Sequence, residues 1–175
     1  MRRSALPMFF VVLLLATASA VSATADTVTV SDISTLQAAI DAAPVGGRTI
    51  EIAAGTHVLG APNLLINKSD ITIQGAGTLG TRIQVSGTGS RFYITSPGCT
   101  IRNLEIEKTD KAVIQGIIYV GAMNTTIEAN RIHGQCVLGD RQTDRAMEVA
   151  YGTTNLQVTG NEIYGLRQPG YLNGS

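Results

Sequence analysis

The chain has 175 residues, and its 13 basic and 13 acidic side chains give a formal net charge of zero. A balanced charge excludes a globally basic chain that is attracted to nucleic acid or to acidic polymers, so we expect no nucleic-acid partner. Nineteen glycines, no tryptophan and 5% aromatic residues indicate a chain that turns often and has few large rings.

Residues 1–25 have the pattern of a secretory signal peptide. Two early arginines form a positive start, residues 6–15 form an apolar run, and Ala23–Ala25 is a small-residue cleavage motif, with Ala18–Ala20 as a second one. The apolar run is shorter than the about 20 residues of a transmembrane helix. We therefore expect cleavage, secretion to an extracellular or periplasmic location, a mature domain over residues 26–175, and no membrane association afterwards.

Residues 27–47 have the features of an N-terminal cap. A short strand over residues 27–30 precedes an amphipathic helix that ends at Pro44. Ser34, followed three residues later by Gln37, matches a capping box. Such a helix would cover the first coil of a repeat fold, whose open end exposes apolar core and strand edges. The apolar face of the predicted helix consists of Leu36, Ala39, Ile40 and Ala43.

The central part of the chain repeats one pattern four times: apolar–x–apolar, then another apolar residue seven positions later. The copies start 28, 26 and 31 residues apart, a period typical of solenoids. Alternation with period two indicates strands, and stacked coils would align equivalent side chains in inward columns. The predicted columns are Leu64–Phe92–Ile118–Val149, Ile66–Ile94–Val120–Tyr151, Ile73–Ile101–Ile127–Val158, Ile71–Cys99–Thr125–Leu156 and Ile106–Ile132–Ile163.

Three stretches, Leu36–Pro44, Gly47–His57 and Ile71–Gly77, resemble the opening of pectate-lyase-like right-handed β-helix proteins. Two later turns, Asn130–Ile132 and Asn161–Ile163, resemble the N-x-I turns of that superfamily. The resemblance implies an all-β fold: a right-handed parallel β-helix solenoid with an N-terminal amphipathic capping helix. The superfamily includes polysaccharide lyases, glycoside hydrolases, pectin methylesterases, uronan epimerases and non-enzymatic surface proteins, so it implies a fold and not one activity.

Outward positions carry charged and amide side chains. Glu105, Arg131 and Glu162 align in one column, which predicts either a ladder of ion pairs or a sugar-acid groove with Arg131 on a carboxylate. Asn130 and Asn161 align at a turn and predict an asparagine ladder. His133 follows on the outer face, where it would be a structural residue or a general base.

The longest repeat contains a charged loop over residues 133–148. Lyases of the superfamily hold Ca²⁺ on a sugar carboxylate with acidic residues and abstract a proton with a basic side chain. By this resemblance the three acidic residues would bind Ca²⁺, and one arginine would act as the base; alternatively, the charges pair with one another in a solvated loop. The residues concerned are Asp140, Asp144 and Glu148 for the metal, and Arg145 and Arg141 for catalysis.

Two functions remain open from the sequence. The first is an exported enzyme, a lyase or hydrolase acting on polysaccharide; the second is a non-catalytic surface or matrix rod, which the low aromatic content favours. An ice-binding solenoid fits less well because the outward columns mix threonine with charged residues. A Cys99–Cys136 disulfide is less expected than a buried free Cys99. The C-terminal end lacks a cap, so we expect a partner there or continuation in a longer protein; the oligomeric state is open.

Overall fold

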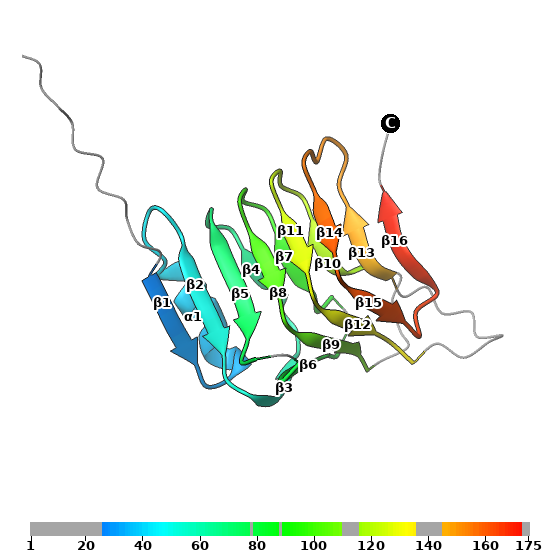
Figure 1. Ribbon diagram of the computed structural model, residues 1–175, viewed down its shortest axis with the longest axis horizontal. Helices are drawn as coiled ribbons and strands as arrows, with labels where there is room; N and C mark the ends of the chain where they lie inside the picture. The colour runs from blue at the N-terminus through cyan, green and yellow to red at the C-terminus, as the bar shows by residue number, and fades with distance from the viewer. Residues whose placement is uncertain (1–25, 78, 88, 110–115, 136–144, 173–175) are drawn as a thin grey trace, which may run out of the picture.

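The computed structural model describes residues 26–77, 79–87, 89–109, 116–135 and 145–172. These residues form a β-solenoid of about five turns, in which three parallel sheets run side by side along the long axis (Figure 1). The predicted β-solenoid is therefore confirmed. The predicted signal peptide, Cys136, Asp140, Arg141 and Asp144 lie outside the described residues.

Each turn contributes one short strand to each sheet. Sheet A contains β1 (Asp26–Val30), β2 (Arg48–Ile52), β5 (Ile71–Gly75), β8 (Thr100–Arg102), β11 (Thr126–Glu128) and β14 (Gln157–Thr159) in spatial order. Sheet B contains β3 (Gly55–Leu59), β6 (Thr81–Val85), β9 (Glu105–Lys108), β12 (Arg131–His133) and β15 (Glu162–Tyr164). Sheet C contains β4 (Leu64–Ile66), β7 (Phe92–Ile94), β10 (Gly116–Val120), β13 (Arg145–Val149) and β16 (Gln168–Leu172).

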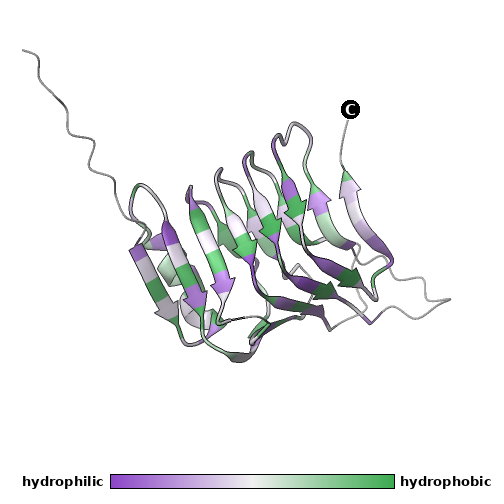
Figure 2. Cartoon of the chain, viewed as in Figure 1, coloured by the Kyte–Doolittle hydropathy of each residue, from purple (hydrophilic) through white to green (hydrophobic). Residues whose placement is uncertain are grey.

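The core lies along the axis of the solenoid. Hydrophobic and hydrophilic residues alternate along the strands, as Figure 2 shows most clearly for β1, β2 and β5. Ile73, Ile101 and Ile127 are in register on neighbouring strands and are fully buried. Ile83, Ile106 and Ile132 form an equivalent buried column in sheet B, so the column principle is confirmed.

The predicted register of β13 is wrong by two residues. Met147 pairs with Ile118, and Val149 pairs with Val120, whereas Tyr151 lies beyond the strand and is 78% exposed. The step from sheet C to sheet A takes seven positions in the three preceding turns but nine from Val149 onward. Two of the additional residues of the longest repeat therefore lie in this step from sheet C to sheet A, and the others lie in the sequence before β13.

The helix α1 (Ile33–Asp41) lies at the β1 end of the solenoid (Figure 1). Its Leu36 and Ile40 side chains are fully buried in the common core. The predicted capping box is wrong, because Asp32 is the N-cap: its Oδ1 accepts hydrogen bonds from the amides of Ser34 (2.9 Å) and Thr35 (3.2 Å).

The predicted capping-box glutamine instead bonds to another strand. Gln37 Nε2 donates to the carbonyl of Leu65 at 3.0 Å, and the Leu65 amide donates to Gln37 Oε1 at 2.9 Å. Since β4 is the end strand of sheet C, this amide satisfies backbone groups that the sheet itself leaves unpaired.

The predicted asparagine ladder is confirmed at the corner between sheets A and B. Asn130 is buried; its Oδ1 accepts from the Leu104 amide at 3.1 Å, and its Nδ2 donates to the Ile101 carbonyl at 2.9 Å. Asn161 continues the ladder, because its Oδ1 accepts from Asn130 Nδ2 at 3.0 Å. The residue before Asn130, Ala129, has a φ of 52°, which gives the chain its sharp bend.

The last described turn buries much less than the turns before it. Val158 is 41% exposed and Leu172 is 75% exposed, whereas Ile127, the residue paired with Val158, is fully buried. The strands β14, β15 and β16 are the end strands of their sheets at this side. Within the described part of the chain, this end of the core is open.

Candidate functional site

The outer face of sheet C carries a stack of tyrosine rings. Tyr93 on β7 and Tyr119 on β10 are in register, with ring centroids 4.5 Å apart and ring planes at 15°. Since β4 lies on the other side of β7 from β10, the second face of Tyr93 is turned toward β4. Leu65 of β4 is in register with Tyr93 on that side, and the Tyr93 side chain remains partly exposed beside it.

An arginine and a carboxylate hold this stack. The guanidinium carbon of Arg91 lies 4.8 Å from the centroids of both rings, and Arg91 Nη1 lies 3.3 Å from Glu148 Oε2 on β13. Burial raises the pKa of the Tyr119 hydroxyl, and the neighbouring Tyr93 and the Glu148 carboxylate raise it further. Tyr119 is therefore neutral at physiological pH and lies beside the Arg91–Glu148 ion pair.

A hollow of about 620 Å³ is lined in part by Tyr93 and Leu65. This volume is in the range of protein sites for small molecules and sugar units, roughly 300–1,000 Å³. Gln37 takes part in the wall while its amide also donates to Asp41 Oδ1 at 2.9 Å. The hollow thus combines an aromatic face, amides and one carboxylate. The described residues that line it are Gln37, Asp41, Pro62, Asn63, Leu65, Asn67 and Tyr93.

The hollow gathers residues that sequence reasoning did not select. The signal for Tyr93 and Tyr119 was present, because Phe-Tyr-Ile and Ile-Tyr-Val align in successive copies of the repeat. The contribution of α1 had no such signal, since the contact of Gln37 with β4 joins residues 28 positions apart.

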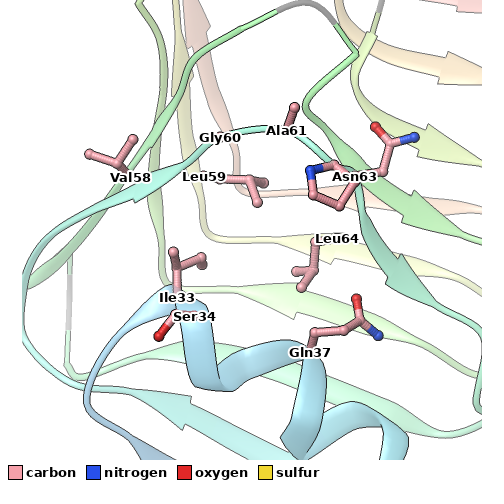
Figure 3. A pocket seen from close by; sticks show the side chains of 10 residues that line it. Ile33, Ser34, Gln37, Val58, Leu59, Gly60, Ala61, Asn63 and Leu64 are labelled. Atoms are coloured by element: carbon pink, nitrogen blue, oxygen red, sulfur yellow. The ribbon is translucent and has the colours of Figure 1, made fainter.

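A second hollow, of about 330 Å³, lies between α1 and the segment that connects β3 to β4 (Figure 3). The side chains of Ile33, Leu59 and Leu64 face its interior, whereas Gln37 extends away toward β4. This space is mostly apolar, and its walls belong to the packing of α1 on the first turn.

Two residues of the predicted calcium-dependent site are described, and both have partners. Arg145 Nε donates to Gln168 Oε1 at 2.8 Å, and its guanidinium carbon lies 4.2 Å from the Tyr171 ring centroid. Glu148 pairs with Arg91 at 3.3 Å. No group of three His, Cys, Asp or Glu side chains suited to a metal occurs within the described ranges. Asp140, Arg141 and Asp144 lie outside those ranges, so the calcium site stays a prediction.

The outer face of sheet B carries the predicted charge column. Glu105, Arg131 and Glu162 are in register, and Arg131 Nε lies 2.9 Å from Glu162 Oε2. His133 is buried, its Nε2 lies 3.0 Å from Glu105 Oε1, and its ring stacks on Tyr164 with centroids 4.9 Å apart. The column is therefore an ion-pair ladder, in which Arg131 already has a carboxylate partner.

The carboxyl group of Glu107, next to this column, has a lowered pKa. Burial alone would raise the pKa of its carboxyl, but the hydrogen bond from Gln84 and the charge of Arg82 outweigh burial. Arg82 Nη2 lies 2.8 Å from Glu107 Oε2, and His133 adds a smaller effect. The pKa of Glu107 consequently lies below its usual range, so the carboxylate is ionised and stabilises the folded state at neutral pH.

Cys99 is a free, buried thiol in the predicted inward column. Its Sγ lies 3.1 Å from the Ser96 carbonyl, and burial raises the pKa of the thiol. A protonated, buried thiol is a packing residue and not a nucleophile.

Comparison of the chain with protein-family models, with curated proteins and with solved structures finds no match. Among the described residues, α1 is the one helix, and it is too short to cross a membrane.

Proposed function

We propose that this protein is an exported, right-handed parallel β-helix of the pectate-lyase-like superfamily and that it binds polysaccharide along the outer face of sheet C. The sequence resemblance and the parallel three-sheet solenoid support the superfamily and the handedness. The contacts of Leu36, Ile40 and Gln37 support a capping role for α1. The pattern of residues 1–25 supports secretion.

One observation carries the proposed binding: Tyr93, the end ring of the tyrosine stack, lines a hollow together with amides and a carboxylate. Sugar rings present a C–H face that packs on aromatic rings and a rim of hydroxyls that bonds to amides and carboxylates. A rigid solenoid keeps the outward positions of successive strands at a spacing of about 4.8 Å, which suits an extended polymer.

A catalytic role in a calcium-dependent lyase is the second candidate. In the sequence, the charged segment with Asp140, Arg141 and Asp144 directly precedes β13, the strand of sheet C that carries Arg145 and Glu148. An arginine acts as a base only when its guanidinium is strongly perturbed. Arg145 is held by Gln168 and Tyr171, an arrangement that supports binding more than proton abstraction.

The test of the proposed function is a binding assay on a panel of uncharged and acidic polysaccharides by isothermal calorimetry and affinity electrophoresis. We expect binding to at least one of them and a loss of at least tenfold in affinity for Tyr93→Ala. Tyr151→Ala is the matched control, because this tyrosine is exposed and lies outside sheet C. If no polysaccharide binds, or if both variants behave alike, the proposal is wrong and the non-catalytic rod replaces it.

A further inference from the structure

The hollow beside Tyr93 has a distinct charge. Asp41 is the one acidic or basic residue among the described residues that line it. Its carboxylate is exposed, and Oδ1 accepts a hydrogen bond from Gln37. A neutral amide does not cancel the charge of a carboxylate, so the wall formed by α1 is negative.

The end of α1 adds to this charge. Asp41 is the last residue of the nine-residue helix, and the last turn contains no basic residue. The C-terminal end of a helix carries a partial negative charge from its unpaired carbonyl groups, equivalent to roughly half a unit charge. Arg48 Nη1 donates to the Ala39 carbonyl of this last turn at 3.1 Å and offsets part of that charge, so the Asp41 carboxylate is the main source of negative charge at the hollow.

The described residues that line the hollow include no basic side chain. Arg91, on the same face, lies against the two tyrosine rings and pairs with Glu148, and Arg145 donates to Gln168 and lies over Tyr171. A uronate carboxylate in the hollow would meet a negative wall without a dedicated cation. Hydroxyl groups, in contrast, are good donors to the Asp41 carboxylate.

We infer that the sheet C site takes uncharged, hydroxyl-rich polysaccharides and discriminates against uronans. This inference rests on the proposed function and specifies its ligand class. Tyr93 would contact the apolar face of a neutral sugar ring, while Asp41 and the exposed Asn67 would bond to its hydroxyls. Specificity then follows from the repulsion of an acidic sugar more than from a better fit of the neutral one.

The experiment compares xylan and mixed-linkage β-glucan with polygalacturonate on the full chain. Measurements at low salt and at about 0.15 M salt, where the screening length is about 8 Å, separate charge from shape. We expect an uncharged polymer to bind at least tenfold more tightly than polygalacturonate at low salt, with a smaller ratio at higher salt. Chitosan is included as a cationic polymer.

Two substitutions isolate the role of the charge. Asp41→Asn should raise the affinity for polygalacturonate at least threefold and change the affinity for the uncharged polymer less. Glu162→Gln removes the same charge from sheet B, on a different face of the solenoid, and should leave both affinities unchanged.

The outcomes separate the inference from the proposed function. Polygalacturonate that binds as tightly as the uncharged polymers, with Tyr93→Ala abolishing the binding, overturns the inference and leaves the proposed function intact. Binding to chitosan alone, or an Asp41→Asn variant without effect on uronan affinity, also overturns the inference. Absence of binding to every polymer overturns the proposed function itself.

Discussion

The substitution Asn130→Ala tests the asparagine ladder that fixes the corner between sheets A and B. It removes the acceptor of the Leu104 amide and the donor to the Ile101 carbonyl, and both residues are fully buried. A buried polar group without a partner costs about 1–3 kcal/mol, so the two groups together cost about 2–6 kcal/mol. Domains are stable by only about 5–15 kcal/mol, so this loss is large.

Urea unfolding followed by far-UV circular dichroism measures the loss. With a slope of about 2 kcal/mol per molar urea, the midpoint should fall by about 1–3 M while the slope stays unchanged. Asn67→Ala is the control, because Asn67 is exposed and its replacement should change the free energy of unfolding by less than about 0.5 kcal/mol. An Asn130→Ala variant whose midpoint matches that of the control would refute the role of the ladder.

Three further predictions concern the core, the contact between α1 and β4, and the pH dependence. Ile127→Asp buries a charge and should abolish folded, secreted protein. Val158→Asp, in the same column but 41% exposed, should still fold. A wild-type circular dichroism spectrum for Ile127→Asp would contradict the assignment of Ile127 to the buried column. Gln37→Ala leaves the amide and carbonyl of Leu65 without their side-chain partner and should increase self-association in light scattering. A variant that stays monomeric at all concentrations would show that Gln37 does not protect this sheet edge. Because the pKa of Glu107 is lowered in the folded protein, its carboxylate stabilises the fold above the unfolded-state pKa of about 4.3, and this stabilisation is lost as the pH falls through the folded-state pKa. Glu107→Gln should therefore reduce the slope of the free energy of unfolding against pH in acid. Equal slopes for the wild type and the variant would show that the carboxylate has no such role.

The sequence predicted the columns of the core but not every register. Period-two alternation identifies the inward positions of Ile101, Ile127 and Ile132, because a strand turns successive side chains to opposite faces. The spacing rule failed at β13, where Tyr151 looked like an inward residue. A turn two residues longer than its predecessors leaves this side chain in solvent, and Met147 and Val149 take the inward positions.

The candidate site was less accessible to sequence reasoning. The repeat alignment places Tyr93 beside Tyr119, but it contains no information on where α1 lies relative to sheet C. The hollow depends on that placement, because Asp41 and Gln37 come from the helix and Asn67 from the end of β4. Charge density in the longest repeat pointed to Asp140 and Asp144, which lie outside the described residues, so that site stays a prediction.

The three connections between the sheets differ in length, and this difference shows where the solenoid tolerates inserted residues. The corner between sheets A and B takes five positions in each of the last three turns, and one inserted residue there would turn the side chains of the following sheet B strand to the opposite face. The connection from sheet B to sheet C lengthens along the chain, and doubling a loop costs only about 0.6 kcal/mol in closure entropy. A peptide epitope or a small domain is therefore best inserted in the connection from sheet B to sheet C, whose length already varies between turns. The successive spans are His57 to Leu64, Ile83 to Phe92, Ile106 to Ile118 and Ile132 to Met147.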